Sequence, residues 1–156
     1  MITFRKMKKT DVPKLYEMAL RAFQSDFEKY GIYPPLLHLK KKNFQPPLLF
    51  GKVILADGNE IGGVFVIVLG KKAELATIFI DPKYQHQGYG KEILSALEAA
   101  HPHVKKWTLE TVSENFQLHR FYESLGYHKV GEKKDPRSDV ITYLYEKKIK
   151  EQSSIN

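Results

Sequence analysis

The chain has 156 residues, of which 42% are hydrophobic and 28% charged, which is enough apolar material for one packed core and argues against disorder. It contains no cysteine, which excludes disulfides, cysteine-ligated zinc, iron–sulfur clusters and a thiol nucleophile. Its formal net charge of +7 raises the question of a nucleic-acid partner.

The positive charge is concentrated near the start of the chain. Residues 1–50 carry 10 Lys/Arg against 4 Asp/Glu, residues 51–100 carry 5 against 6, and residues 101–156 carry 10 against 8. The run Lys40 to Lys42 comes without a zinc-finger or RNA-recognition motif, so it is weak evidence for nucleic acid. We expect a solvated lysine-rich face, with a polyanion site and attraction of a small acidic ligand as the alternatives.

The chain contains no stretch of the roughly 18 to 20 apolar residues that a membrane span requires, and we expect no membrane partner. No apolar segment of a secretory signal follows Met1 to Lys6, so we expect a cytoplasmic protein. Without repeats or linkers, the sequence predicts a single domain over residues 1–149 and a frayed tail over 150–156.

The first half of the chain predicts a strand, a helix and an antiparallel meander. A strand over 2–5 precedes a helix that starts at Thr10 or Asp11 and runs to about Phe27. Residues 30–49 hold four prolines and predict a loop with at most a short helix. Strands are expected over 52–56, 61–69 and 73–80, with turns at Asp57-Gly58 and after Gly70, and the second strand should be buried on both faces.

The second half alternates helices and strands. A helix follows Gly90 and ends before His101-Pro102, and a strand is expected over 106–111. A helix over 115–125 has Leu118, Phe121, Tyr122 and Leu125 on one side, and Gly126 supplies its left-handed C-cap. Strands over 127–133 and 140–148 complete an α/β domain with a mixed sheet.

The most informative segment joins strand 73–80 to the helix after it, and it reads Ile80-Asp81-Pro82-Lys83-Tyr84-Gln85-His86-Gln87-Gly88-Tyr89-Gly90-Lys91. Two glycines at the start of a helix let free backbone N–H groups approach an anion, which the helix dipole also favours. The segment lacks the residues of a P-loop, and Ile93 stands where a dinucleotide fingerprint needs its third glycine. By itself the turn fits an anion cradle or an ordinary turn.

Gln85-His86-Gln87-Gly88-Tyr89-Gly90 resembles the [QR]-x-x-G-x-[GA] acyl-coenzyme A motif of the GNAT N-acetyltransferase superfamily. Ile78 to Tyr84 is similar to the strand and turn that precede this loop, and Asn115 to Tyr127 is similar to the second signature, N-x(5)-FYxxLGF/Y. The element order over residues 2–148 is also that of the family. The resemblance implies the GNAT fold, a largely antiparallel mixed sheet flanked by helices, with acetyl-CoA as co-substrate and no metal.

The resemblance also implies residues for coenzyme A. Main-chain N–H groups of Gln87 to Lys91 would bind the pyrophosphate, with Gln85 and His86 either adding side-chain contacts or being ordinary turn residues. The strand at Ile78 to Ile80 would splay from strand 106–111 and pair with the pantetheine arm, and an N–H near Ile80 would hold the oxyanion. The implied cofactor-binding residues are Ile78, Phe79, Ile80, Gln85, His86, Gln87, Gly88, Tyr89, Gly90, Lys91, Asn115 and Tyr122.

Two side chains are expected to act in catalysis. Tyr122 would be the general acid for the leaving thiolate, unless it is plain core. Glu74, eleven residues before Gln85, lies where some GNAT histone acetyltransferases carry their catalytic glutamate, and an exposed strand-edge carboxylate is the alternative reading. Glu110 or a water chain is the reserve base, and His119 is expected on the exposed side of its helix. Asn115 would lie near the pantetheine, cap its helix, or do both.

The implied activity is transfer of an acetyl group to a primary amine by direct attack in a ternary complex. The alternatives are a non-catalytic acyl-CoA-binding module and, in third place, a basic nucleic-acid-binding domain. In the family, residues 23–50 and 133–140 shape the acceptor side, and the first segment is aromatic and basic at Tyr30, Tyr33, His38 and Lys40–Lys42. This favours a small or peptidic amine that carries a negative group over a polyamine. A homodimer is left open.

Overall fold

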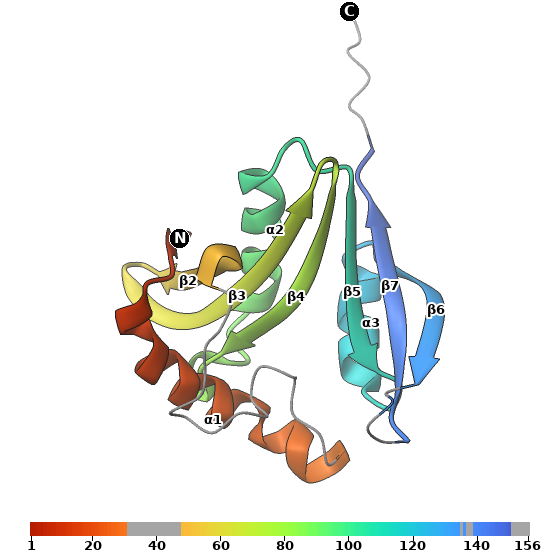
Figure 1. Ribbon diagram of the computed structural model, residues 1–156, viewed down its shortest axis with the longest axis horizontal. Helices are drawn as coiled ribbons and strands as arrows, with labels where there is room; N and C mark the ends of the chain where they lie inside the picture. The colour runs from red at the N-terminus through yellow and green to blue at the C-terminus, as the bar shows by residue number, and fades with distance from the viewer. Residues whose placement is uncertain (31–47, 135, 137–138, 151–156) are drawn as a thin grey trace, which may run out of the picture. The chain divides into compact units, whose positions relative to one another are not determined.

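The computed structural model describes residues 1–30, 48–134, 136 and 139–150 (Figure 1). Most of the expected loop at 30–49 and all but the first residue of the expected tail at 150–156 lie outside the described residues, as do Tyr33, His38 and Lys40–Lys42. The elements in chain order are β1 (Ile2–Lys6), η1 (Lys9–Asp11), α1 (Val12–Tyr30), η4 (Leu48–Phe50), β2 (Gly51–Ala56), β3 (Asn59–Leu69), β4 (Lys72–Ile80), η5 (Pro82–Tyr84), α2 (Tyr89–Ala100), β5 (Lys106–Val112), α3 (Phe116–Ser124), β6 (His128–Lys134) and β7 (Ile141–Lys148), where η marks a 3-10 helix.

Seven strands form one sheet in the order β1-β2-β3-β4-β5-β7-β6. The pairs β1–β2, β2–β3, β5–β7 and β6–β7 are antiparallel, and β4–β5 is parallel. This confirms the expected mixed, largely antiparallel α/β fold. The chain divides into two compact units: unit 1 comprises Met1–Val66 and Thr77–Ala100, and unit 2 comprises Ile67–Ala76 and His101–Asn156.

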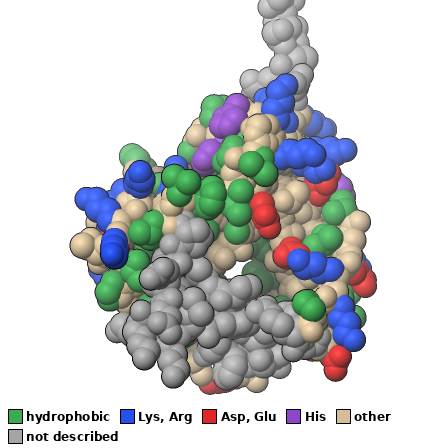
Figure 2. Space-filling model, viewed as in Figure 1, with side chains coloured by type: hydrophobic (Ala, Val, Ile, Leu, Met, Phe, Trp, Pro, Cys, Tyr) green, Lys and Arg blue, Asp and Glu red, His purple; other side chains and the backbone are tan. Residues whose placement is uncertain are grey.

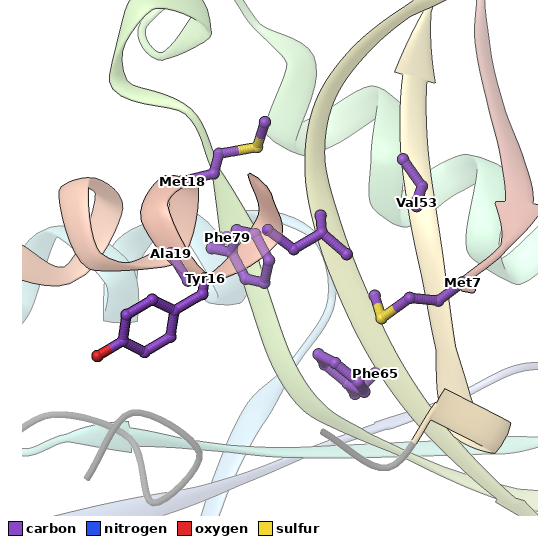
Figure 3. Packing of buried hydrophobic residues seen from close by; sticks show 8 residues of the cluster. Met7, Tyr16, Met18, Ala19, Val53, Phe65 and Phe79 are labelled. Atoms are coloured by element: carbon purple, nitrogen blue, oxygen red, sulfur yellow. The ribbon is translucent and has the colours of Figure 1, made fainter. Parts of the chain in front are cut away.

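The core of unit 1 lies where α1 packs on the sheet (Figure 3). Leu15, Met18 and Ala19 lie along one side of α1, because residues three and four apart in a helix share a face. Their cluster partners are Met7, Tyr16, Val53, Phe65 and Phe79. Residues 61–66 of β3 are all buried, as expected for a strand covered on both faces, but the expectation was wrong for the end of the strand, where Ile67 and Val68 are half-buried and Leu69 is 76% exposed. The helix α1 runs on to Tyr30, beyond the predicted end near Phe27, because the next helix breaker in the sequence is Gly31.

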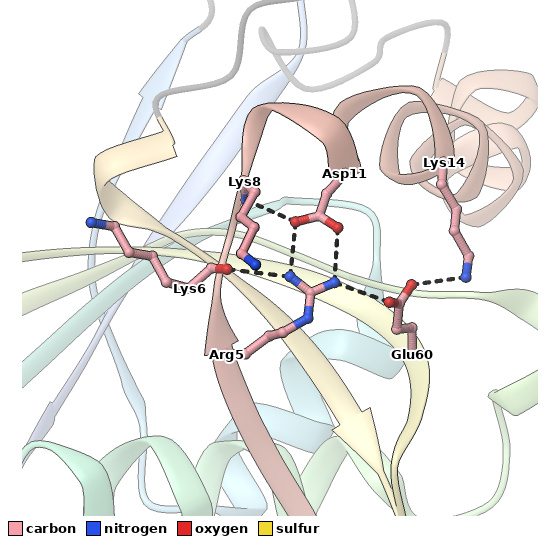
Figure 4. Close-up of polar contacts among 6 residues, drawn as sticks. All are labelled: Arg5, Lys6, Lys8, Asp11, Lys14 and Glu60. Carbon is pink, nitrogen blue, oxygen red and sulfur yellow. Dashed lines mark hydrogen bonds and ion pairs between the residues drawn. The ribbon is translucent and has the colours of Figure 1, made fainter.

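A polar cluster fastens the entry of α1 to β1 and β3 in unit 1 (Figure 4). The Arg5 guanidinium donates to both carboxylate oxygens of Asp11, at 2.9 and 2.8 Å, and to Oε1 of Glu60 at 2.9 Å. Lys14 lies 2.8 Å from the other oxygen of Glu60. Hydrogen bonds from Arg5 lower the pKa of Asp11 to about 2.

Unit 2 places α3 against one side of β5 and β7. The His119 ring stacks on Tyr143 of β7, and its Nε2 lies 2.9 Å from the carbonyl oxygen of Val112 at the end of β5. Gly126 has φ 98°, which confirms the left-handed C-cap that the sequence predicts after this helix. Among the described helices, none is long and apolar enough to cross a membrane.

Candidate functional site

The turn between β4 and α2, in unit 1, has an uncommon backbone. Asp81 caps η5 by accepting a hydrogen bond from the Lys83 amide, and the chain then passes through His86 at φ 63° and Gly88 at φ 81°. Glycine adopts positive φ freely, but a histidine there costs roughly 1 kcal/mol, and such strain is found mainly at functional positions. His86 and Gly88 are both exposed.

This turn leads directly into the first turn of α2, which begins at Tyr89. The first four N–H groups of an α-helix, counted from its cap residue, have no partner within the helix, and here they belong to Gly88, Tyr89, Gly90 and Lys91. Left-handed residues just before a helix turn successive N–H groups toward a common point, which forms a concave anion site. The local geometry therefore suits a phosphate group, as the motif predicts.

The two glutamines of the motif brace the turn. Gln85 Nε2 donates to the Ile80 carbonyl at 2.9 Å, and Gln87 Nε2 donates to the Lys83 carbonyl at 3.0 Å. Both side chains are thereby occupied with the protein's own backbone. They fix the shape of the turn, so that the main chain is what a ligand would meet.

Asp81 anchors the start of the turn to α1. The residue is 5% exposed, its carboxylate accepts a hydrogen bond from Arg21 at 2.8 Å, and its amide donates to the Ile61 carbonyl at 2.7 Å. Burial by itself would raise the pKa of Asp81, but the hydrogen bonds from Arg21 and the Lys83 amide outweigh it and lower that pKa. Sequence reasoning missed this anchor, for which an Asp-Pro pair directly after a strand was the only signal.

Two glycines of β3 set the position of Phe79 in β4. A Cβ atom on Gly62 would lie 2.0 Å from the Phe79 carbonyl oxygen, and one on Gly63 would lie 2.6 Å from the Phe79 ring. The Phe79 side chain is buried in the core of unit 1, whereas Ile78 and Ile80 are half-buried. Glycine at both positions thus allows the close approach of β3 to the strand that carries the turn.

In unit 2, Tyr122 lies on the buried side of α3. It is 7% exposed and its ring meets those of Phe121 and Tyr127 edge-on, at centroid distances of 5.3 and 5.6 Å. Among the described residues its hydroxyl has no hydrogen-bond partner. Burial raises the pKa of this phenol to about 12, so it is fully protonated at neutral pH.

Asn115 and His119 occupy the same helix. The Asn115 side chain accepts a hydrogen bond from the Leu118 amide at 3.2 Å, which confirms its capping role. His119 is 6% exposed, so the expectation that it lies on the exposed side of α3 is wrong. Because a carbonyl oxygen can only accept, Nε2 of His119 must donate the hydrogen bond to Val112. The His119 ring also packs α3 against β7 through its stacking on Tyr143.

The two carboxylates considered as bases differ in their surroundings within unit 2. Glu74 is exposed on β4, opposite Thr108 of β5, and has no ion-pair partner among the described residues. Glu110 lies 2.8 Å from the ammonium of Lys133 and is therefore engaged. Of the two, Glu74 is the carboxylate without an ion pair among the described residues, and the role of either one as the base stays a prediction.

The parallel pairing of β4 with β5 is short. It joins Lys72, Ala73 and Glu74 to Lys106, Trp107 and Thr108, whereas β4 itself continues to Ile80. The predicted splay beyond this point, and the pairing of Ile78 to Ile80 with a pantetheine arm, stay predictions because these residues belong to unit 1 and β5 to unit 2.

Comparison with known proteins identifies the family. Residues 12–127 match the model of the acetyltransferase (GNAT) family, and no curated protein matches the sequence. The chain is similar to the structure of the ribosomal-protein-S18-alanine N-acetyltransferase from Escherichia coli, with TM-score 0.72 and 20% identity over 100% of this chain and 99% of that one.

Two further structures have the same fold. One is the PaiA N-acetyltransferase from Thermoplasma acidophilum in complex with coenzyme A, with TM-score 0.72 and 21% identity over 95% of this chain and 99% of that one. The other is a spermidine N-acetyltransferase chimera from Vibrio cholerae and a human enzyme, with TM-score 0.71 and 17% identity over 94% and 95%. The fold, the glycine turn before α2 and the family match lead to one conclusion: this chain belongs to the GNAT family of acetyltransferases.

Proposed function

We propose that this protein transfers the acetyl group of acetyl-CoA to a primary amine by direct attack, with the residues that the motifs indicate. The observation that carries the proposal is the turn before α2, where His86 and Gly88 both have positive φ and lead into four free helix N–H groups. The acetyltransferase family match covers this turn and Tyr122 alike. Because the matched residues come from both units, we keep residues 1–149 as one domain in this proposal.

In this proposal the coenzyme is held mainly by main-chain groups. The N–H groups of Gln87 to Lys91 bind the pyrophosphate, with Gly88 permitting the close approach. The backbone of Ile78, Phe79 and Ile80 pairs with the amide-rich pantetheine arm in the manner of an added strand, and an N–H near Ile80 holds the oxyanion. Asn115 adds a polar group next to the pantetheine while it caps α3.

Tyr122 acts on the leaving group. When the amine nitrogen bonds to the carbonyl carbon, the carbon–sulfur bond breaks and coenzyme A leaves as a thiolate. A phenol with a pKa of about 12 is protonated at neutral pH and available as a donor, but full transfer of its proton to a thiolate, whose thiol has a pKa of about 8.5, is unfavourable by about 3.5 pKa units. Tyr122 therefore stabilises the thiolate chiefly by hydrogen bonding, and solvent completes the protonation.

Glu74 accepts the proton that the attacking amine loses. A primary amine near pKa 10 is mostly ammonium at pH 7 and has no lone pair for attack until it is deprotonated. Glu74 is exposed and free of an ion pair among the described residues, and because it lies six residues before Ile80 in β4, it receives that proton through a chain of waters. The absence of cysteine from the sequence is consistent with direct transfer rather than a sulfur-bound acetyl intermediate.

The first experiment measures thermal stability with acetyl-CoA and thiol release with a panel of amines. A ligand present at 100 times its Kd should stabilise the protein by about 2.7 kcal/mol. Stabilisation with amine-dependent thiol release supports the enzyme. Stabilisation by acetyl-CoA without thiol release for any amine would support a non-catalytic acyl-CoA-binding module. No stabilisation at all would favour a nucleic-acid-binding domain.

The second experiment tests the base. In Glu74→Gln, the limb of the kcat/KM profile against pH that reports deprotonation of the base should disappear, while acetyl-CoA still binds. Glu110→Gln is the matched control, because its carboxylate is already paired with Lys133. A profile with that limb intact in Glu74→Gln would remove the assignment.

A further inference from the structure

A buried hydroxyl of unit 2 has no hydrogen-bond partner. Thr111 of β5 is 5% exposed, its Oγ1 is buried, and among the described residues nothing donates to it or accepts from it. Burying a hydroxyl without a hydrogen bond costs free energy, and a valine would fill the same space without that cost. Native proteins retain few such groups, and a role in catalysis or ligand binding is one reason for retaining them. Thr111 therefore needs an explanation beyond packing.

Thr111 lies on the side of the sheet that α3 covers. It is the strand partner of Tyr143 in β7, and the side chains of strand partners lie next to each other on one side of a sheet. The Tyr143 ring stacks on His119 of α3 at a centroid distance of 5.0 Å. The Thr111 side chain therefore lies in the layer between the sheet and α3.

The opposite side of the same strands is charged. Lys106 pairs with Glu146 at 2.9 Å, and Glu110 pairs with Lys133 at 2.8 Å. Because side chains alternate along a strand, Lys106 and Glu110 point away from the side that carries Thr111. Figure 2 shows charged side chains gathered over the part of the molecule that holds β5, β7 and β6. The sheet itself thus separates the Thr111 hydroxyl from these ion pairs.

The proposed donor to the leaving thiolate lies under the same helix. Tyr122 follows His119 by three residues, is 7% exposed, and its hydroxyl also has no partner among the described residues. Long side chains of a helix lean toward its N-terminus. That end of α3 adjoins the end of β5, because the Val112 carbonyl accepts hydrogen bonds from the Asn115 amide at 3.0 Å and from His119 at 2.9 Å. We therefore expect the Tyr122 hydroxyl in the same layer as Thr111.

A second buried donor of β5 has different surroundings. The indole nitrogen of Trp107 also has no partner among the described residues, but at Trp107 the strand pairs with both neighbours, with Ala73 of β4 and Lys147 of β7. At Thr111 the described register joins β5 to β7 alone. Four residues of strand, roughly 13 Å, separate the two. Of these two groups, only Thr111 lies where β5 has backbone groups that the described sheet does not use.

We propose that the Thr111 hydroxyl is a second hydrogen-bond donor to the sulfur of coenzyme A, beside the hydroxyl of Tyr122. The role rests on the proposed function, in which the amine nitrogen bonds to the carbonyl carbon and the carbon–sulfur bond breaks. The sulfur takes the bonding electron pair and leaves as a thiolate, which can accept more than one hydrogen bond. Thr111 keeps its proton throughout, and its donation stabilises the negative charge that develops on sulfur in the transition state.

The first test replaces Thr111 by a side chain of the same shape. Thr111→Val should melt at or above the wild-type temperature, because an unpaired polar group is no longer buried. Its kcat for thiol release should fall about tenfold while the Kd for acetyl-CoA stays the same, because a hydrogen bond to developing charge is lost. A role in packing alone would not lower kcat without lowering stability.

Two further variants control for shape and for the loss of a hydroxyl. Thr111→Ser keeps the hydroxyl and should recover most of the wild-type kcat. Thr142→Val removes a hydroxyl from β7 that lies on the opposite side of the sheet, where it donates to the Lys133 carbonyl, and should leave kcat unchanged. Should Thr111→Val fail to fold, Thr111→Ala removes the same hydroxyl and takes its place in each measurement.

The second test observes the sulfur directly and needs no acceptor. A free thiol has a pKa of about 8.5, and hydrogen bonds donated to the thiolate lower the pKa of the bound thiol. Ultraviolet absorbance of the thiolate, followed against pH with coenzyme A bound, should give a pKa about one unit higher in Thr111→Val than in the wild type. Desulfo-coenzyme A, which lacks the sulfur, should bind both proteins with the same Kd.

The outcomes separate this role from the proposed function. If amines release thiol but Thr111→Val keeps the wild-type kcat and the wild-type pKa of the bound thiol, Thr111 is not a donor and the acetyltransferase stands. If coenzyme A binds but no amine releases thiol, the proposed function fails, and the titration still decides whether Thr111 donates to the sulfur. If neither acetyl-CoA nor coenzyme A binds, both fail.

Discussion

The turn before α2 and the lysine row, formed by the strand partners Lys72, Lys106 and Lys148, are assembled in different ways. The turn takes its residues from one stretch of sequence, Asp81 to Lys91, and its conformation follows from local chemistry at Asp81, Gln85 and Gly88. The lysine row takes one residue from each of three strands, and 42 residues separate Lys106 from Lys148 in the sequence. A local turn is visible as a motif, whereas a cluster of charges made by strand register appears only when the strands are paired.

The largest expected effect is on stability, from a substitution in β3 that disturbs β4, the strand that leads into the turn. In Gly62→Ala, the new Cβ would meet the Phe79 carbonyl at 2.0 Å, and overpacking against backbone should lower the free energy of unfolding by about 3 kcal/mol. Thermal unfolding measures this. Gly131→Ala in β6, where the nearest atom would be 3.4 Å away, is the control and should cost little. Equal melting temperatures for the two variants would show that β3 does not hold β4 as described.

The next effect tests the buried phenol of unit 2. Tyr122→Phe should lower kcat by about 100-fold, because the donor to the thiolate is lost, while the Kd for acetyl-CoA stays the same. Initial rates of product formation give kcat, and calorimetry gives the Kd for acetyl-CoA. Tyr127→Phe removes a neighbouring buried phenol and should leave kcat close to wild type. Normal turnover of Tyr122→Phe on a good acceptor would show that Tyr122 is not the donor to the thiolate and has only a structural role.

A smaller effect tests the backbone of the turn. Gly88→Ala should raise the Kd for acetyl-CoA about tenfold, since a left-handed conformation costs a residue with a Cβ about 1 to 2 kcal/mol. Gly70→Ala is matched to it, because Gly70 has φ 63° and open space around it but lies in the turn between β3 and β4 within unit 2. Calorimetry should find an unchanged Kd for Gly70→Ala. An unchanged Kd for Gly88→Ala as well would mean that the turn does not bind the coenzyme in this conformation.

The smallest effect is a pH-dependent change in stability at the polar cluster of Arg5, Asp11 and Glu60 in unit 1. The pKa of Asp11 is lowered to about 2 in the folded protein, so its interactions stabilise above the unfolded value near 3.8 and are lost as the pH falls toward 2. Asp11→Asn should therefore cost roughly 1 to 2 kcal/mol at pH 7 and almost nothing near pH 2. Denaturant titrations at several pH values measure this. Asp57→Asn, at an exposed pair with the N-terminus, should show little effect at any pH.

Much of the fold was predictable because the signals are local. Turn residues such as Asp57, Gly58 and Gly126 adopt the positive φ that their chemistry allows, and the N-cap of α3 is the predicted Asn115. His119 was predicted wrongly because a polar residue beside an apolar stripe reads as exposed. Its burial depends on Tyr143 and Tyr145, which reach it from a distant strand.

The sequence by itself determined the order of elements, the turn chemistry and the motif that leads to the GNAT family, since each depends on residues close together in the chain. Sequence counting also placed the excess of positive charge in residues 1–50. Only the tertiary structure showed that Lys72, Lys106 and Lys148, from segments of nearly balanced charge, share one row beside Glu74. Strand register decides which charges become neighbours, and register is fixed by the packing of the whole sheet rather than by any local pattern.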